Sequence, residues 1–189
     1  MNLALNLVFA TALSLPLAGH ADEYKTVQYD KSTLTFSFKQ MGVGMNGNFK
    51  KFDARVDFNP ANLTGSQAQF DLDVASIDVG SDEGNDAVVG KQWFDVKAFP
   101  KARFTSNAIK SLGGNRYEAS GALTIKGRTK IITTPATMTV SGKTASFDGA
   151  FAIQRTDYGI GEGAWSSVDI VANEIQIKFH LLASTNAAN

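Results

Sequence analysis

Apolar and polar side chains alternate along most of the chain after Tyr24. A period of two is typical of β-strands that bury one face and expose the other. The clearest case is residues 51–58, where every second position is apolar: Phe52, Ala54, Val56 and Phe58. The same pattern marks five further segments, residues 34–38, 67–74, 117–125, 147–153 and 174–181. The chain is therefore predicted to be all-β from Tyr24 onward.

Short turn sequences separate these segments. They include Asn59-Pro60, Gly113-Gly114-Asn115, Lys126-Gly127-Arg128 and Ser141-Gly142-Lys143. Strands joined so closely must be antiparallel, because a parallel crossover needs a dozen or more residues. We expect about eight strands, and a single sheet of that size hides its edges best by closing into a barrel.

One segment, residues 82–95, breaks the period of two. It begins with acidic residues and shows no alternation. We expect a short helix or helical loop here, lying across one end of the barrel. With no internal repeat and no linker in the sequence, residues 22–189 are predicted to form one domain.

The first residues have the layout of a secretory signal peptide. An apolar run extends to Leu17, and the small residues Gly19 and Ala21 occupy the −3 and −1 positions of a cleavage site. The run is shorter than the ~20 residues that a membrane-spanning helix requires. Residues 1–21 are therefore predicted to be removed, which makes the periplasm the expected location, or secretion beyond it.

Composition excludes several classes of protein. The 18 basic side chains balance the 18 acidic ones, and no basic block suggests nucleic-acid binding. The chain has no cysteine, so it can form no disulfide and lacks the residue to which a lipoprotein anchor is attached. No segment after residue 21 is apolar enough to span a bilayer, and the mature chain is expected to have no transmembrane segment.

The interior of the predicted barrel allows two interpretations. Twelve of the thirteen phenylalanines follow residue 21, most of them on the inward parity of strands. They can simply fill the core, or they can line a cavity, because eight-stranded barrels are near the size that holds one small ligand. Strands of ten residues would give a tube about 33 Å long at ~3.3 Å per residue, which suits a linear apolar molecule. The pattern alone does not decide between the two.

Five blocks of sequence, in the same order along the chain, carry a resemblance to a known family. They are Phe38-Lys39-Gln40-Met41-Gly42-Val43, Ala75-Ser76-Ile77-Asp78-Val79-Gly80, residues 93–106 around Trp93-Phe94-Asp95, residues 121–127, and residues 155–165 from Arg155-Thr156-Asp157 to Trp165. In these blocks the chain resembles the YceI-like family over nearly all of its length after the signal segment. It departs from the common family pattern at Lys39-Gln40 and Asn85-Asp86.

The resemblance implies a lipocalin-like barrel that binds a polyisoprenoid chain. Some relatives are joined to a membrane b-type cytochrome, so the resemblance also implies a quinone-like ligand and leaves open such a cytochrome as a partner. Whether the protein forms a homodimer is left open as well.

Catalytic and metal sites are disfavoured by the residues present. His180 is the one histidine after the signal segment, and no nucleophile is identified beside it. There is no pair of histidines at ligand spacing and no HExxH motif, so neither a metal nor a cofactor is expected. Gly159, Gly161 and Gly163 lack the spacing of a phosphate-binding loop and are expected to form a bulged connection. Arg155 and Asp157 can pair with each other or address a ligand head, and the pairing is favoured.

The sequence therefore favours a periplasmic carrier of a long-chain isoprenoid or related lipid, polyprenyl or quinone-like, held inside the barrel. The alternatives are a filled barrel that serves as a partner of membrane proteins and, less favoured, a small enzyme dependent on His180. Apolar residues on the inward parity are predicted to contact the ligand: Phe36, Phe38, Phe70, Leu72, Phe104, Leu123, Phe151, Ile153 and Phe179. Trp93 and Trp165 are predicted to lie at the mouth.

Overall fold

The computed structural model describes residues 23–185, and the predicted signal segment 1–21 lies outside them. Within these residues, eleven strands form one antiparallel sheet. The strands are β1 (Tyr24–Val27), β2 (Thr33–Gln40), β3 (Val43–Phe49), β4 (Phe52–Asp57), β5 (Gln67–Asp73), β6 (Ile77–Asp78), β7 (Lys101–Gly113), β8 (Arg116–Ile125), β9 (Arg128–Ser141), β10 (Thr144–Gln154) and β11 (Glu174–Thr185).

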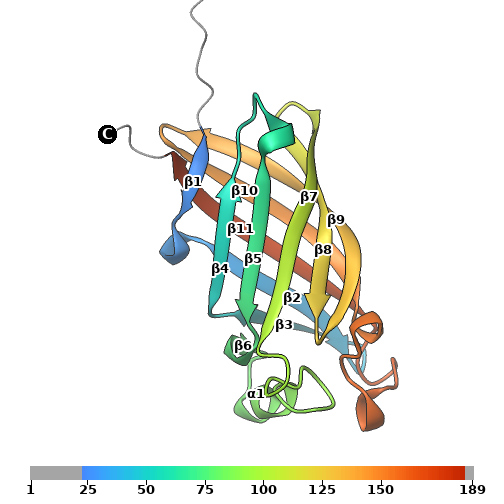
Figure 1. Ribbon diagram of the computed structural model, residues 1–189. Helices are drawn as coiled ribbons and strands as arrows, with labels where there is room; N and C mark the ends of the chain where they lie inside the picture. Colours follow the sequence, from blue (N-terminus) through green and yellow to red (C-terminus); the bar gives the residue numbers. More distant parts are fainter. Residues whose placement is uncertain (1–22, 186–189) are drawn as a thin grey trace, which may run out of the picture.

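The sheet is strongly curled and forms an incompletely closed barrel (Figure 1). Its strand order is β4-β5-β7-β8-β9-β10-β11-β2-β3-β6, with β1 paired to β11. The run from β7 to β10 is a meander of hairpins, as the short turns predict, whereas residues 155–173 connect β10 to β11. The antiparallel barrel-like fold predicted from the sequence is confirmed.

Two small contacts bring the ends of the curled sheet together. Tyr24 of β1 bridges to Phe58 after β4, with N–H···O distances of 2.9 and 3.2 Å between the two backbones. Tyr29 lies in the 3-10 turn that follows β1 (Tyr29–Lys31). Its hydroxyl donates to the Ala54 carbonyl (3.0 Å) and accepts from the Ala54 amide (3.2 Å). A side chain thus satisfies the backbone groups of β4 where no neighbouring strand does.

Eleven strands replace the eight expected, because the additional strands give little sequence signal. β1 and β6 have four and two residues, too few to show a period of two. β3 reads Val-Gly-Met-Asn-Gly-Asn-Phe, in which Gly47 interrupts the apolar alternation of Val43, Met45 and Phe49. β3 pairs with β2 as a local hairpin, because the two-residue turn Met41-Gly42 has positive φ at both positions.

The predicted helical segment is confirmed and is shorter than residues 82–95. Helix α1 (Asp82–Val88) begins after Ser81, whose hydroxyl accepts from the Gly84 amide at 3.2 Å. Residues 90–99 continue as turns. Figure 1 shows α1 at the end of the barrel opposite β1.

Buried side chains form two clusters, one at each end of the barrel. We call the first the α1-end cluster: Phe36, Val74, Ile77, Val88, Ala102, Phe104, Leu123, Ile125, Ile153, Tyr158, Ile160 and Ile177. We call the second the β1-end cluster: Tyr24, Ala54, Val56, Phe58, Met138, Ala145, Phe147, Leu181 and Ala183. The strand members mostly follow the predicted inward parity, since a one-residue slip would turn each strand's apolar face to solvent.

Candidate functional site: the barrel cavity

A cavity of about 220 Å³ lies inside the barrel, and side chains of both clusters line it. Native cores contain few voids larger than a water molecule, and an engineered apolar cavity of about 150 Å³ already binds benzene. The space inside this barrel is therefore of ligand-binding size. Its lining extends from Val88 and Ile160 at the α1 end to Phe58, Phe147 and Leu181 at the β1 end.

Inward-facing glycines help to keep the cavity open. Phe36 of β2 is the cross-strand neighbour of Gly47 of β3. A Cβ atom placed on Gly47 would lie 2.2 Å from Cζ of Phe36, closer than any real contact. The missing side chain therefore lets the phenyl ring lie across the neighbouring strand.

Ten of the eleven predicted site residues line this cavity. They are Phe36, Phe38, Phe70, Leu72, Trp93, Phe104, Leu123, Phe151, Ile153 and Phe179. That they contact a ligand stays a prediction. Trp165 is not part of the lining; it packs against Trp93, with 5.5 Å between ring centroids.

The sequence prediction missed other lining residues for two reasons. Ile175 and Leu181 share the parity of Phe179 on β11 and could have been included. Val88, Phe94 and Val171 also line the cavity, but they belong to α1 and to irregular segments. No period identifies an inward side chain in such segments.

Two segments, residues 82–99 and 155–172, lie at the α1 end of the barrel, and we call them the end segments (Figure 1). Arg155 organises the second of them. Its side chain has no exposed surface, and its guanidinium donates at 2.8–3.3 Å to backbone carbonyls of Ile160, Gly161, Trp165, Ser167, Val171 and Ala172. Burial lowers the pKa of Arg155 below its usual value.

The favoured pairing of Arg155 with Asp157 is therefore wrong. The guanidinium is directed at main-chain carbonyls, and the Asp157 carboxylate lies 3.9 Å from Lys130. Gly161 makes room for this arrangement: its φ is 75°, and a Cβ there would lie 2.5 Å from Nη1 of Arg155. Two 3-10 turns, Arg155–Tyr158 and Gly163–Trp165, form the connection expected around the glycines.

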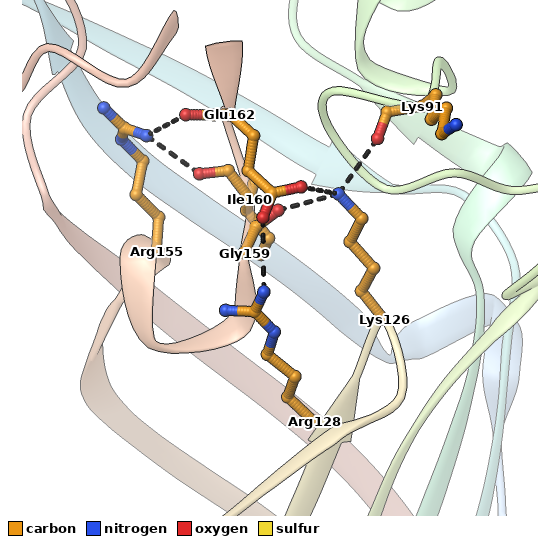
Figure 2. Close-up of polar contacts among 8 residues, drawn as sticks. Lys91, Lys126, Arg128, Arg155, Gly159, Ile160 and Glu162 are labelled. Carbon is orange, nitrogen blue, oxygen red and sulfur yellow. Dashed lines mark hydrogen bonds and ion pairs between the residues drawn. The ribbon is translucent and has the colours of Figure 1, made fainter.

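Lys126, in the β8–β9 turn, joins the two end segments (Figure 2). Its Nζ donates to the Lys91 carbonyl (2.9 Å), the Gly159 carbonyl (2.8 Å) and Oε2 of Glu162 (2.9 Å). The ammonium of Lys126 is the main cause that lowers the pKa of Glu162 below its usual value. The Glu162 amide also donates to the Gln92 carbonyl at 2.7 Å. This end of the cavity is thus held by a polar network outside an apolar wall.

The histidine on which catalysis would depend lies away from the cavity. His180 is on the outer face of β11, with its Nδ1 atom 2.5 Å from Oδ1 of Asp148. Across residues 23–185, no three His, Cys, Asp or Glu side chains gather as metal ligands would. Of the helices described, none has the length and apolar character to cross a bilayer.

Comparison with known proteins assigns the chain to a family. The model of the YceI-like domain matches residues 25–183. A UPF0312 protein of Pseudomonas putida (strain W619) is 32% identical over 175 residues, which cover 85% of this chain and 88% of that protein. A UPF0312 protein of Vibrio cholerae is 28% identical over 170 residues, covering 85% and 90% of the two chains.

Solved structures agree in fold. The crystal structure of Burkholderia cenocepacia BcnA matches with a TM-score of 0.81 and 47% identity, covering 84% of this chain and 99% of that one. A polyisoprenoid binding domain from Saccharophagus degradans matches with a TM-score of 0.65 and 16% identity, covering 88% and 99% of the two chains. Because the family model, the sequence relatives and the fold agree over the same residues, the chain belongs to the YceI-like family.

Proposed function

We propose that this protein binds one long-chain isoprenoid or related lipid, polyprenyl or quinone-like, inside its barrel and carries it through the periplasm. The observation that supports this most is the cavity of about 220 Å³ with apolar side chains along its length. Such a cavity offers a long chain a dry environment. It also argues against the filled barrel that the sequence left open.

Desolvation supplies the driving force. Each buried CH₂ group contributes about 0.8 kcal/mol, so a chain of several isoprene units has enough gross energy to offset the cost of ordering it. Apolar walls discriminate weakly between chains, by about 1–3 kcal/mol per methylene. The wall therefore favours a class of ligand rather than one molecule.

The proposal that the ligand is an isoprenoid rests on similarity to known proteins. Membership of the YceI-like family and the printed description of the Saccharophagus degradans domain as polyisoprenoid binding both support it. The periplasmic location rests on the signal-peptide pattern in residues 1–21. A membrane b-type cytochrome partner and a homodimer stay predictions.

We propose binding rather than catalysis, because the lining offers no acid–base pair. Arg155 lines the cavity, and its donors are directed at carbonyls. The histidine on which a small enzyme would depend, His180, lies on the outer face beside Asp148.

A cavity-filling variant tests the proposal. Phe151 lines the cavity and pairs with Ile177 across β10 and β11, so Phe151→Trp places a larger ring inside the barrel. Ile131→Trp is the matched control, because Ile131 is 66% exposed. We expect Phe151→Trp to weaken binding of a polyprenol or a quinone at least several-fold, and Ile131→Trp to bind as the wild type does. Equal binding by all three folded proteins would overturn the proposal.

A further inference from the structure

The wall of the barrel is interrupted along one line. The strand order ends at β4 on one side and at β3, with the two-residue β6, on the other. β3 and β4 follow each other in the chain, yet β3 pairs with β2 and β6, whereas β4 pairs with β5. We call the line between β4 and the edge formed by Tyr29, β2 and β3 the seam (Figure 1). Within residues 23–185 no strand ladder closes it, and a single bridge, Tyr24 to Phe58, crosses it at the β1 end.

Tyr29 supplies the next contact along the seam. Its hydroxyl donates to the Ala54 carbonyl and accepts from the Ala54 amide, at 3.0 and 3.2 Å. Tyr29 is 49% exposed, so water can replace these two hydrogen bonds when they break. A segment held by a few exposed hydrogen bonds opens more readily than a packed core. The seam is therefore a part of the barrel wall that can open locally.

A groove on the outside of the seam is separated from the cavity by one aromatic ring. Its lining includes Tyr29 and Thr33 on one side of the seam and Phe52 on the other. Phe49, the last residue of β3, lines both the groove and the cavity, and among the described residues it is the one that does so. Its ring packs against Phe36, with 4.9 Å between centroids. A rotation of the Phe49 ring would connect the groove to the cavity.

The two ends of the barrel are closed by more extensive contacts. At the α1 end, the buried Arg155 and the side chain of Lys126 bind backbone carbonyls of the end segments. At the β1 end, the buried ring of Phe147 packs edge-to-face against Tyr24 and Phe58, with 6.4 and 5.1 Å between centroids. Opening either end would break a buried network or a packed aromatic cluster, which costs more than releasing one exposed tyrosine.

We propose that the lipid enters and leaves the cavity through the seam, between Phe49 of β3 and Phe52 of β4, rather than through either end of the barrel. The Phe49 ring is the gate, and the hydrogen bonds of Tyr29 keep β4 in place beside it. The groove carries charged side chains as well as aromatic ones, among them Lys51 and Asp53, which suits an amphiphilic molecule in transit. This proposal rests on the proposed function and adds to it the route that the ligand takes.

Tyr29→Phe tests the proposal without altering the cavity wall, because Tyr29 is not part of its lining. The variant loses both hydrogen bonds to Ala54, so the seam opens more often. We expect tritiated geranylgeraniol to be taken up, and released into excess cyclodextrin, about tenfold faster than in the wild type. The equilibrium affinity should stay the same, because a gate changes both rates equally.

Lys126→Met is the matched comparison, because it loosens the rival route at the α1 end. We expect its uptake and release rates to stay near those of the wild type. Faster exchange in Lys126→Met than in Tyr29→Phe would overturn the proposal.

A chemical block tests the route directly. The chain has no cysteine, so Thr33→Cys introduces a single thiol in the groove. Ile131→Cys introduces one on β9, at a residue that is 66% exposed. After loading with geranylgeraniol, attachment of fluorescein maleimide should slow release several-fold in Thr33→Cys and leave release unchanged in Ile131→Cys.

Equal release from labelled and unlabelled Thr33→Cys would overturn the proposal, even though the protein binds the lipid. Failure of the wild type to take up any geranylgeraniol would instead contradict the proposed function.

Discussion

Gly149 and Phe179 are cross-strand neighbours on β10 and β11, and the absence of a side chain at Gly149 makes room for the phenyl ring. A Cβ atom on Gly149 would lie 2.3 Å from Cζ of Phe179 and 2.4 Å from the Pro135 carbonyl oxygen. The ring of Phe179 can therefore lie across the strand while still lining the cavity. The same relationship holds between Gly47 and Phe36. Each glycine thus lowers the local strand propensity but leaves room inside the barrel for a neighbouring phenyl ring.

Replacing Gly149 by alanine is expected to close part of the cavity. The added methyl group forces Phe179 inward and presses on a backbone carbonyl, which overpacks the wall and costs about 1–3 kcal/mol of stability. Thermal unfolding and lipid titration of Gly149→Ala would measure both effects. Gly44→Ala is the control, because its Cβ would meet nothing within 4 Å. If Gly149→Ala keeps the stability and lipid affinity of Gly44→Ala, the glycine has no role in keeping the cavity open.

Arg155 is expected to be essential for the structure of the second end segment. Lysine carries the same charge but is not expected to replace it. Lysine has three donors on one nitrogen and cannot reach all six carbonyls that Arg155 binds. Leaving several buried carbonyls unpaired should destabilise Arg155→Lys by about 3 kcal/mol or more in urea unfolding. Arg103→Lys is the control: Arg103 is exposed and paired with Asp71 on the outer face, so its change should be small. Similar urea midpoints for the two variants would contradict this account.

Lys126→Met is expected to loosen the α1 end without unfolding the barrel. The substitution removes three donated hydrogen bonds that join the end segments, and the side chain of Lys126 is only 9% exposed. Hydrogen exchange of amides in residues 90–95 and 159–165 should accelerate about tenfold or more. Arg128→Met is the matched control, because Arg128 contacts the same Glu162 carboxylate and is 52% exposed. Equal exchange in the two variants would show that Lys126 does not hold the segments together.

Asp78 is expected to make stability fall in acid. Hydrogen bonds from Lys50, the Gly80 amide and Asn85 lower the pKa of Asp78 from 3.8 to about 2. Because the folded pKa lies below the unfolded one, the stability this carboxylate contributes is fully present above about pH 4. It is lost as the pH falls toward 2. The Asp78 side-chain carboxyl signal should titrate near pH 2 in NMR, and Asp78→Asn should lose less stability than the wild type between about pH 5 and pH 2.5. A midpoint near 3.8 would contradict the expectation.

The fold could be predicted because the alternation of apolar and polar residues shows which side chains of each strand are buried. In residues 52–58 every second side chain faces the interior, as the alternation requires. The short strands β1 and β6 could not be predicted. Their pairing depends on where the curled sheet brings its ends, and local sequence carries no signal for that. The bridge from Tyr24 to Phe58 spans more than thirty residues in the chain for the same reason.

The strand residues of the cavity wall could be predicted from the sequence, whereas the contacts of the end segments could not. Parity placed Phe36, Phe151 and Phe179 on the cavity side. In contrast, the roles of Arg155 and Lys126 arise from irregular backbone, where carbonyl directions follow from tertiary structure.

The most direct test of the lipid-carrier account is native mass spectrometry of the protein purified from the cells that produce it, followed by solvent extraction. The account predicts one stoichiometric adduct whose extracted mass is that of a long-chain isoprenoid or quinone-like lipid, and its loss in Phe151→Trp. A clean unliganded mass in the wild type that also takes up no added polyprenol or quinone would contradict it.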